Sequence, residues 1–209
     1  IRQWLGFAPA RSEILIPNFL IRTMSKVADG LGRLGWRSPL RSTAIKVLAD
    51  GVTGIPTNLS EFGMPPVRSL SQTLASMPAR AEDRLFARMA LVTPMIIATL
   101  IVFWLLSGIF GVLRVYEAAR VLEDVGWPYA LAVTSVVFWA IVDIGIAAGL
   151  AYRPYAKMAC WCAIAVSLFY LAASTLFVPH LWLDPLGPLV KVLPSIALAL
   201  VARIALATR

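Results

Sequence analysis

The sequence predicts an all-α integral membrane protein: a bundle of four transmembrane helices preceded by a short helical cytoplasmic segment. Apolar residues make up 59% of the 209-residue chain and the mean hydropathy is +0.79, whereas soluble proteins contain roughly 45–50% apolar residues. These residues also gather after Arg88, where long, nearly uncharged stretches follow a basic, loop-rich region. We therefore expect two parts, a cytoplasmic segment at 1–88 and a membrane domain at 89–209.

Four apolar stretches are long enough to be membrane spans, because about 20 apolar residues cross the roughly 30 Å hydrocarbon core. The predicted spans are about 89–113, 128–150, 158–178 and 187–207. The last one has the weakest pattern, since Lys191 and Arg203 lie near its ends. A count of three spans would, however, leave its apolar residues in water.

The charge distribution predicts the orientation. The net charge is +8, and 12 of the 19 basic residues lie in the first 88 positions, against six acidic ones. Basic residues are enriched on the cytoplasmic flanks of membrane helices, and Arg80, Arg84 and Arg88 come directly before the first span. We expect both termini in the cytoplasm of a bacterial inner membrane, and lipid rather than nucleic acid as the partner of this charge.

The first 88 residues show helical patterns and no confident strand. Apolar residues recur every three to four positions after Pro17 and predict an amphipathic helix to about Leu31. Further short helices are expected at 39–49 and 67–76, with a loop at 54–66, and residues 79–88 are expected to run towards the first span. Because three short helices make a poor independent domain, and because the chain starts with Ile1 and not Met, we expect a fragment of a longer protein.

Gly30, Gly32 and Gly35 have the spacing of a dinucleotide-binding glycine motif. That motif needs a strand before it and a helix after it, whereas here the preceding residues are helical in pattern and Pro39 follows. Helix termination at glycine is the better interpretation. No cofactor-binding residue and no catalytic motif is therefore predicted, and the catalytic residues are unknown. The single histidine, His180, excludes a multi-histidine metal site.

Asp143 is the only acidic residue well inside a predicted span. A charge at mid-membrane costs roughly 2.5–3.5 kcal/mol on insertion scales, and such charges usually pair. Counted from the cytoplasmic ends of the helices, Arg203 has a comparable depth. We therefore predict that Asp143 and Arg203 form an intramembrane polar site and are in contact, directly or through water. A structural ion pair and a proton or ligand site remain the two alternatives.

Two family resemblances follow from longer sequence runs. The membrane part resembles the DoxX-like family of four-helix membrane proteins at Ser107-Gly108, Arg114, Gly126-Trp127-Pro128, Asp143, Gly145, Gly149, Arg153-Pro154 and the run from Leu181 to Pro194. The amino-terminal part resembles the carboxyl-terminal lobe of atypical short-chain dehydrogenase-like NAD(P)-binding proteins in the runs RQWLGFAP, LGWRSPLRSTAIKVLADGVTG and SLSQTLASMPARAEDRLFARM. In that family the dinucleotide-binding domain comes first, so the resemblance implies an NAD(P) domain upstream of Ile1.

Together these resemblances imply the membrane-integral, carboxyl-terminal part of an NAD(P)-linked oxidoreductase that couples to a membrane quinone. Arg114 and His180 are then candidates for contacting a quinone or an anionic headgroup, although snorkelling and an interfacial aromatic belt also explain them. The enzymatic assignment would hold only for the full-length protein. The alternative is a non-catalytic membrane anchor or interaction module for a cytoplasmic NAD(P)-binding domain. A transporter with Asp143 as proton carrier is a third, less supported possibility.

Overall fold

The computed structural model describes residues 1–9, 12, 15–51, 68–185 and 187–207. Within these ranges the regular structure is helical and contains no strand. The chain divides into two units, Ile1–Ala90 and Leu91–Arg209, which are described one at a time. The loop expected at 54–66 lies outside the described residues.

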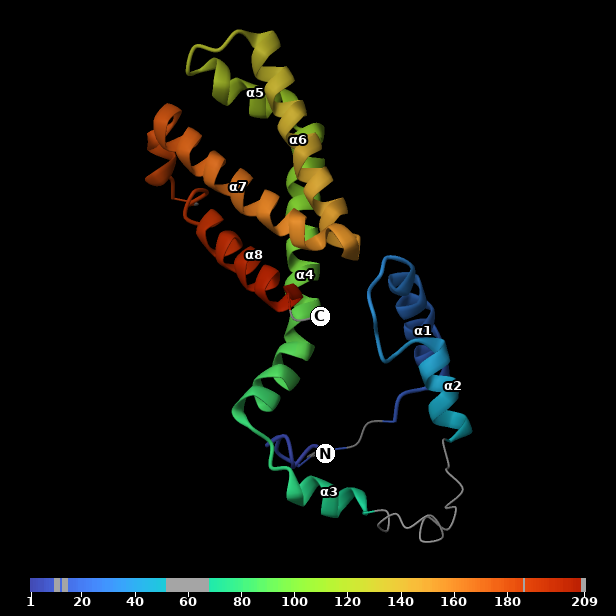
Figure 1. Ribbon diagram of the computed structural model, residues 1–209. Helices are drawn as coiled ribbons and strands as arrows, with labels where there is room; N and C mark the ends of the chain where they lie inside the picture. The colour runs from blue at the N-terminus through green and yellow to red at the C-terminus, as the bar shows by residue number, and fades with distance from the viewer. Residues whose placement is uncertain (10–11, 13–14, 52–67, 186, 208–209) are drawn as a thin grey trace. The chain divides into compact units, whose positions relative to one another are not determined.

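The first unit contains α1 (Asn18–Arg33), α2 (Ser42–Asp50), α3 (Leu70–Ser76) and the beginning of α4 (Figure 1). Helix α1 ends in a glycine cap. Gly35 has a φ of 87°, and the N–H of Trp36 donates to the carbonyl oxygen of Leu31 at 3.0 Å. Because this is the geometry of a Schellman cap, helix termination is confirmed at Gly35, whereas Gly30 and Gly32 lie within α1. No strand precedes them among the described residues.

The second unit holds the rest of α4 (Ala81–Leu113) and the helices that follow it in the chain. These are α5 (Val115–Glu123), α6 (Tyr129–Ala151), α7 (Arg153–Phe177), the short 3-10 helix η2 (Pro179–Trp182) and α8 (Val192–Ala207). Helices α4, α6 and α7 have the length and apolar composition to cross a membrane. The structure therefore supports an integral membrane protein.

The fourth predicted span, 187–207, is helical only from Val192. Before it the chain turns: Gly187 has a φ of 55°, and its N–H donates to the carbonyl oxygen of Asp184 at 2.8 Å. The resulting α8 has 16 residues and rises about 24 Å, less than the roughly 30 Å core. The sequence pattern missed this because the residues of the turn are themselves mostly apolar.

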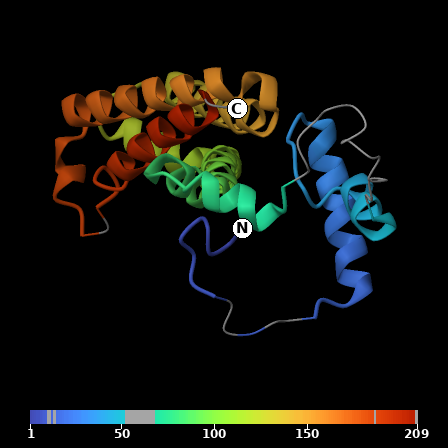
Figure 2. The same ribbon diagram turned by 60° about the horizontal axis from the view of Figure 1, so that its bottom comes forward.

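Helices α6, α7 and α8 pack in sequence order, each against the next, as Figures 1 and 2 both show. Helix α4 meets α6 at Gly108, where an added Cβ would lie 2.6 Å from the carbonyl oxygen of Ala140. Glycine at this position lets the two backbones approach closely. Gly149 approaches Ala159 of α7 in the same way, whereas Gly145 faces open space.

Candidate functional site

A cavity of about 360 Å³ lies in the second unit, bordered by α4, α5, α6 and α7. Its volume falls within the range of small-molecule sites. Asp143, Ser107 and Tyr170 form its polar end, while Trp127 and Phe177 line it near α5. Phe177 is 52% exposed, so the cavity is open to the surface of the bundle.

The polar end is centred on Asp143, whose side chain is buried with 4% of the residue exposed. The Ser107 hydroxyl donates to Oδ2 of Asp143 at 2.6 Å, and the Tyr170 hydroxyl donates to Oδ1 at 2.9 Å. A carboxylate has about four acceptor positions, so two remain after these bonds. Both hydroxyls are neutral, and no ion pair among the described residues involves Asp143. The Asp143 carboxylate can therefore accept further hydrogen bonds and, in the described part of the chain, has no cation beside it that would neutralise its charge.

Three helices supply these groups, and their packing explains why the groups converge. Ser107 precedes Gly108, so the close approach of α4 to α6 brings its hydroxyl to the carboxylate. Tyr170 reaches Asp143 from α7, which packs along the neighbouring side of α6. In hydrocarbon each polar group needs a protein partner, so these bonds also fix the rotation of the three helices about their axes.

Aromatic rings form the wall of the cavity next to this polar end. Trp139 and Phe169 are stacked, with ring centroids 4.6 Å apart and planes inclined by 25°. Tyr170 contacts Trp139 edge-on at 5.4 Å. Trp127 and Phe177 form a second edge-on pair at 6.5 Å nearer α5. Flat apolar walls beside two free acceptor positions suit a planar molecule that carries a polar group at one edge.

The direct contact expected between Asp143 and Arg203 is not formed. The guanidinium of Arg203 lies over the ring of Trp161, 6.0 Å from its centroid, and its Nε has no hydrogen-bond partner among the described residues. Trp161 and Tyr170 are nine residues apart on α7, a rise of about 13 Å. Arg203 and the Asp143 carboxylate therefore lie at different depths.

The predicted depth of Arg203 was wrong because it was counted from the carboxyl end of the chain. Nη2 of Arg153, the first residue of α7, donates to the carbonyl oxygen of Leu206 at 3.3 Å. The start of α7 is thus level with Leu206, three residues from Arg203, whereas Asp143 is ten residues from Arg153 along the chain.

The two headgroup candidates lie away from the cavity lining. Arg114 sits between α4 and α5, where its Nη1 forms an exposed ion pair with Oε1 of Glu117 at 2.6 Å. His180 is an exposed residue of η2. The residues that do shape the polar end are Ser107 and Tyr170, to which the sequence interpretation gave no role. A tyrosine in the middle of an apolar span was the available signal, since a buried hydroxyl requires a partner.

Along α6, Asp143 is 14 residues from Tyr129 at the α5 end and eight from Ala151 at the other end. Ser107 is sixteen residues beyond Leu91, the first residue of the second unit, which corresponds to about 24 Å along the helix. From Asp143 the cavity then continues towards Leu122 of α5 and Trp127. A molecule in it would thus lie between the Asp143 carboxylate and α5.

The helices that build this site carry a recognisable sequence pattern. Residues 101–200 match the DoxX-like family. This DoxX-like segment includes Ser107, Asp143 and Tyr170, and with them the whole polar end of the cavity. Comparisons with curated proteins and with solved structures gave no match to the chain. The family match thus supports a DoxX-like membrane segment, and it does not extend to the amino-terminal residues.

Proposed function

We propose that the DoxX-like segment binds a lipid-soluble quinone in its cavity, as the membrane part of an NAD(P)-linked oxidoreductase. The observation that supports this is the convergence of Asp143, Ser107 and Tyr170 at the end of an open, aromatic-walled cavity. A membrane anchor needs only an apolar exterior. A carboxyl group at mid-membrane is costly to insert, so its presence favours a binding role.

The lining offers each part of a quinone a suitable environment. The planar ring stacks against Trp139 and Phe169, which are already parallel to within 25°. A quinol hydroxyl donates to a free acceptor position of Asp143, whereas a quinone carbonyl accepts from the hydroxyl of Tyr170 or Ser107 after rotation of that group. The apolar tail leaves past Phe177 towards lipid.

The position of the cavity limits how such a quinone exchanges electrons with NAD(P). Hydride transfer requires contact between donor and acceptor, with reacting atoms about 3–3.5 Å apart. In the proposed topology the nicotinamide domain lies on the amino-terminal side, which is about 12 Å from Asp143 measured along α6 to Ala151. The cavity is therefore a binding and exchange site for the quinone, and reduction requires the quinone to leave it.

The proposal includes four spans with both termini in the cytoplasm of a bacterial inner membrane, α8 serving as the fourth. Its 16 residues would require local thinning of the bilayer or snorkelling of flanking residues. Labelling of single cysteines in intact cells with a membrane-impermeant maleimide tests the topology. Cysteines replacing Arg88 and Arg209 should both stay unlabelled, whereas one replacing Glu117 should react. Labelling at Arg209 would refute the even number of spans.

Binding is tested with the full-length protein in nanodiscs and a short-chain quinone. The quinone should quench tryptophan fluorescence saturably, and Asp143→Asn should weaken this binding. NAD(P)H oxidation should then depend on added quinone. Saturable binding without oxidation would restrict the proposal to a quinone-binding module. Absence of saturable binding to the wild-type protein would contradict it and leave the anchor.

A further inference from the structure

Helix α1 packs against α2 through its small and polar residues. Ser25 and Ala28 are the buried residues of α1, with 6% and 4% of their surface exposed. Gly32 lies against Arg41, whose guanidinium carbon would be 3.0 Å from a Cβ added to the glycine. The contact with α2 thus uses the side of α1 that carries Ser25, Ala28 and Gly32, and Ile21, half-buried, is the large apolar residue on that side.

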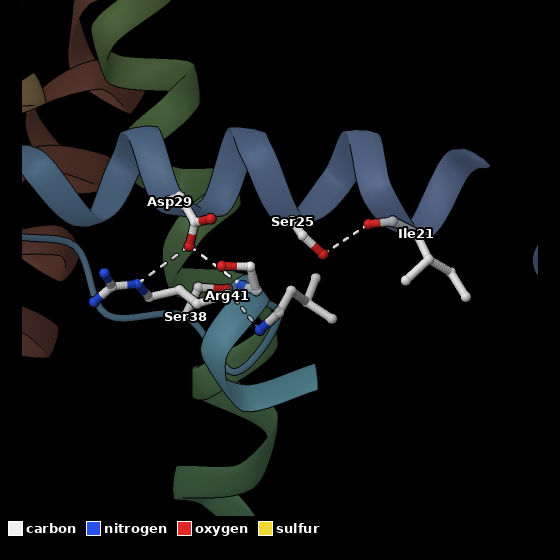
Figure 3. A network of polar contacts seen from close by, with 7 residues as sticks. Ile21, Ser25, Asp29, Ser38 and Arg41 are labelled. Carbon is white, nitrogen blue, oxygen red and sulfur yellow. Dashed lines mark hydrogen bonds and ion pairs between the residues drawn. The ribbon is translucent and has the colours of Figure 1, made fainter. Parts of the chain in front are cut away.

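Polar interactions hold this contact in one orientation, as Figure 3 shows. Oδ1 of Asp29 accepts from the backbone N–H of Ser42 at 3.2 Å and lies 3.6 Å from Nε of Arg41. The Ser25 hydroxyl is turned back to the carbonyl oxygen of Ile21 at 2.7 Å. The contacts of Asp29 on α1 with Arg41 and Ser42, at the amino-terminal end of α2, therefore fix which side of α1 is covered.

The large apolar residues of α1 remain outside. Leu20, Met24, Val27 and Leu31 follow each other at intervals of four, three and four residues and are 42%, 44%, 59% and 44% exposed. At 100° per residue these four side chains fall within one narrow sector of the helix, which we name the α1 stripe. The basic residues Arg22, Lys26 and Arg33 fall in a sector on the other side of the axis.

We infer that α1 is an interfacial helix whose stripe lies in the headgroup region of an anionic lipid bilayer. An apolar stripe, a Lys- and Arg-rich polar face and low overall hydrophobicity distinguish such helices from core helices. In α1 the core-like contact with α2 is made by other residues, so the stripe is free to enter lipid.

Charge favours lipid over a protein partner for the stripe. The first 88 residues carry 12 basic against six acidic residues, and anionic lipid attracts such segments within a Debye length of about 8 Å. A helix with its side chains is about 10–12 Å wide, so the long Arg and Lys side chains of the basic face come within that distance by snorkelling back towards the headgroups. Chain continuity also matters, because the same chain joins α1 to α4, a membrane-span candidate.

Quenching by brominated lipid tests the inference on the full chain in nanodiscs. Val27→Cys carries an environment-sensitive fluorophore in a background with Cys160→Ala and Cys162→Ala, and Arg22→Cys is the matched control on the polar face. In bilayers containing phosphatidylglycerol, quenching at position 27 should exceed that at 22 by about twofold or more. Phosphatidylcholine alone should reduce this difference.

A second variant distinguishes a stripe that is surrounded by lipid from one that is covered by protein. With the fluorophore at Leu20→Cys, the additional change Leu31→Glu should lower quenching, because a charge in the stripe opposes its entry into lipid. Equal and weak quenching at positions 22 and 27 in anionic bilayers would overturn the inference. A fluorophore at position 27 that is shielded from water yet not quenched by brominated lipid would also overturn it, because protein would then cover the stripe. Neither result depends on whether the cavity binds a quinone.

Discussion

Tyr170 of α7 and Asp143 of α6 are joined across the helix interface by a 2.9 Å hydrogen bond from the phenolic hydroxyl to Oδ1. Ser107 of α4 bonds the other carboxylate oxygen at 2.6 Å. The same carboxylate thus connects three helices and forms the end of the cavity. A hydrogen bond between membrane helices contributes only about 0.6–2 kcal/mol. A conservative variant that removes one such bond should therefore leave the helices packed, so that its effect on ligand binding can be measured separately.

Tyr170→Phe removes the hydroxyl and keeps the ring in the aromatic wall. We expect quinone affinity to fall by up to about tenfold, since the lost hydrogen bond to a neutral quinone carbonyl contributes about 0.5–1.5 kcal/mol. The bundle itself should lose only about 1 kcal/mol. Tyr155→Phe, at an exposed position outside the cavity, is the control. Saturable tryptophan quenching measures both affinities, and an unchanged affinity in Tyr170→Phe would exclude the hydroxyl from the site.

Gly108→Ala and Gly145→Ala form a matched pair for the contact of α4 with α6. At Gly108 the new methyl would lie 2.6 Å from backbone and side-chain atoms, whereas at Gly145 nothing lies within 4 Å. We expect Gly108→Ala to destabilise the bundle by about 1–3 kcal/mol through overpacking. Gly145→Ala should be neutral or stabilise it by up to about 1 kcal/mol, because alanine favours helix more than glycine.

Thermal unfolding followed by circular dichroism in nanodiscs compares these two variants. Gly108→Ala should also weaken quinone binding, because moving α4 away separates Ser107 from Asp143. Equal melting temperatures for both variants would mean that the close approach at Gly108 contributes nothing to stability.

The sequence predicted the spanning helices near 89–113, 128–150 and 158–178 because apolar runs of this length with at most one charge are typical of membrane spans. It could not predict which residue meets Asp143. The predicted depths of Asp143 and Arg203 assume that Arg153 and Arg209 lie at the same level in the membrane. In the structure the bond from Arg153 to Leu206 aligns α7 with α8 instead. Rotation about each helix axis depends on contacts such as Gly108 with Ala140, and these are not visible in the hydropathy of single segments.

Trp104 lies one turn before Ser107 and presents an unusual donor. It is 2% exposed, and its Nε1 has no hydrogen-bond partner among the residues that the structure describes. Removing a buried, unpaired donor recovers its desolvation penalty of about 1–3 kcal/mol, which offsets the smaller ring of phenylalanine. Trp104→Phe should therefore be close to neutral, whereas Trp104→Ala should cost about 3–5 kcal/mol. The same unfolding measurement checks both, and an equal loss in the two variants would show that Nε1 is paired.

The contact between α1 and α2 should depend on pH through Asp29. Hydrogen bonding from Ser42, followed by the nearby Arg41 guanidinium, holds the pKa of Asp29 below its ordinary value of 3.8. A lowered folded pKa means that the stabilisation is complete above the unfolded pKa and is lost as the pH falls through the folded one. The contact should therefore be unchanged between pH 7 and 5 and weaken only below pH 3.8.

Spin labels at Thr23→Cys on α1 and Thr43→Cys on α2 report this distance in the full chain, with Cys160 and Cys162 replaced by alanine. The distance distribution should be narrow at neutral pH and broaden below the ordinary pKa of Asp29. Asp29→Asn should broaden it already at neutral pH and remove the dependence, because the neutral amide no longer attracts the Arg41 guanidinium. Asp50→Asn, an exposed change at the end of α2, should keep the wild-type profile. A wild-type transition retained in Asp29→Asn would assign the pH dependence to another group.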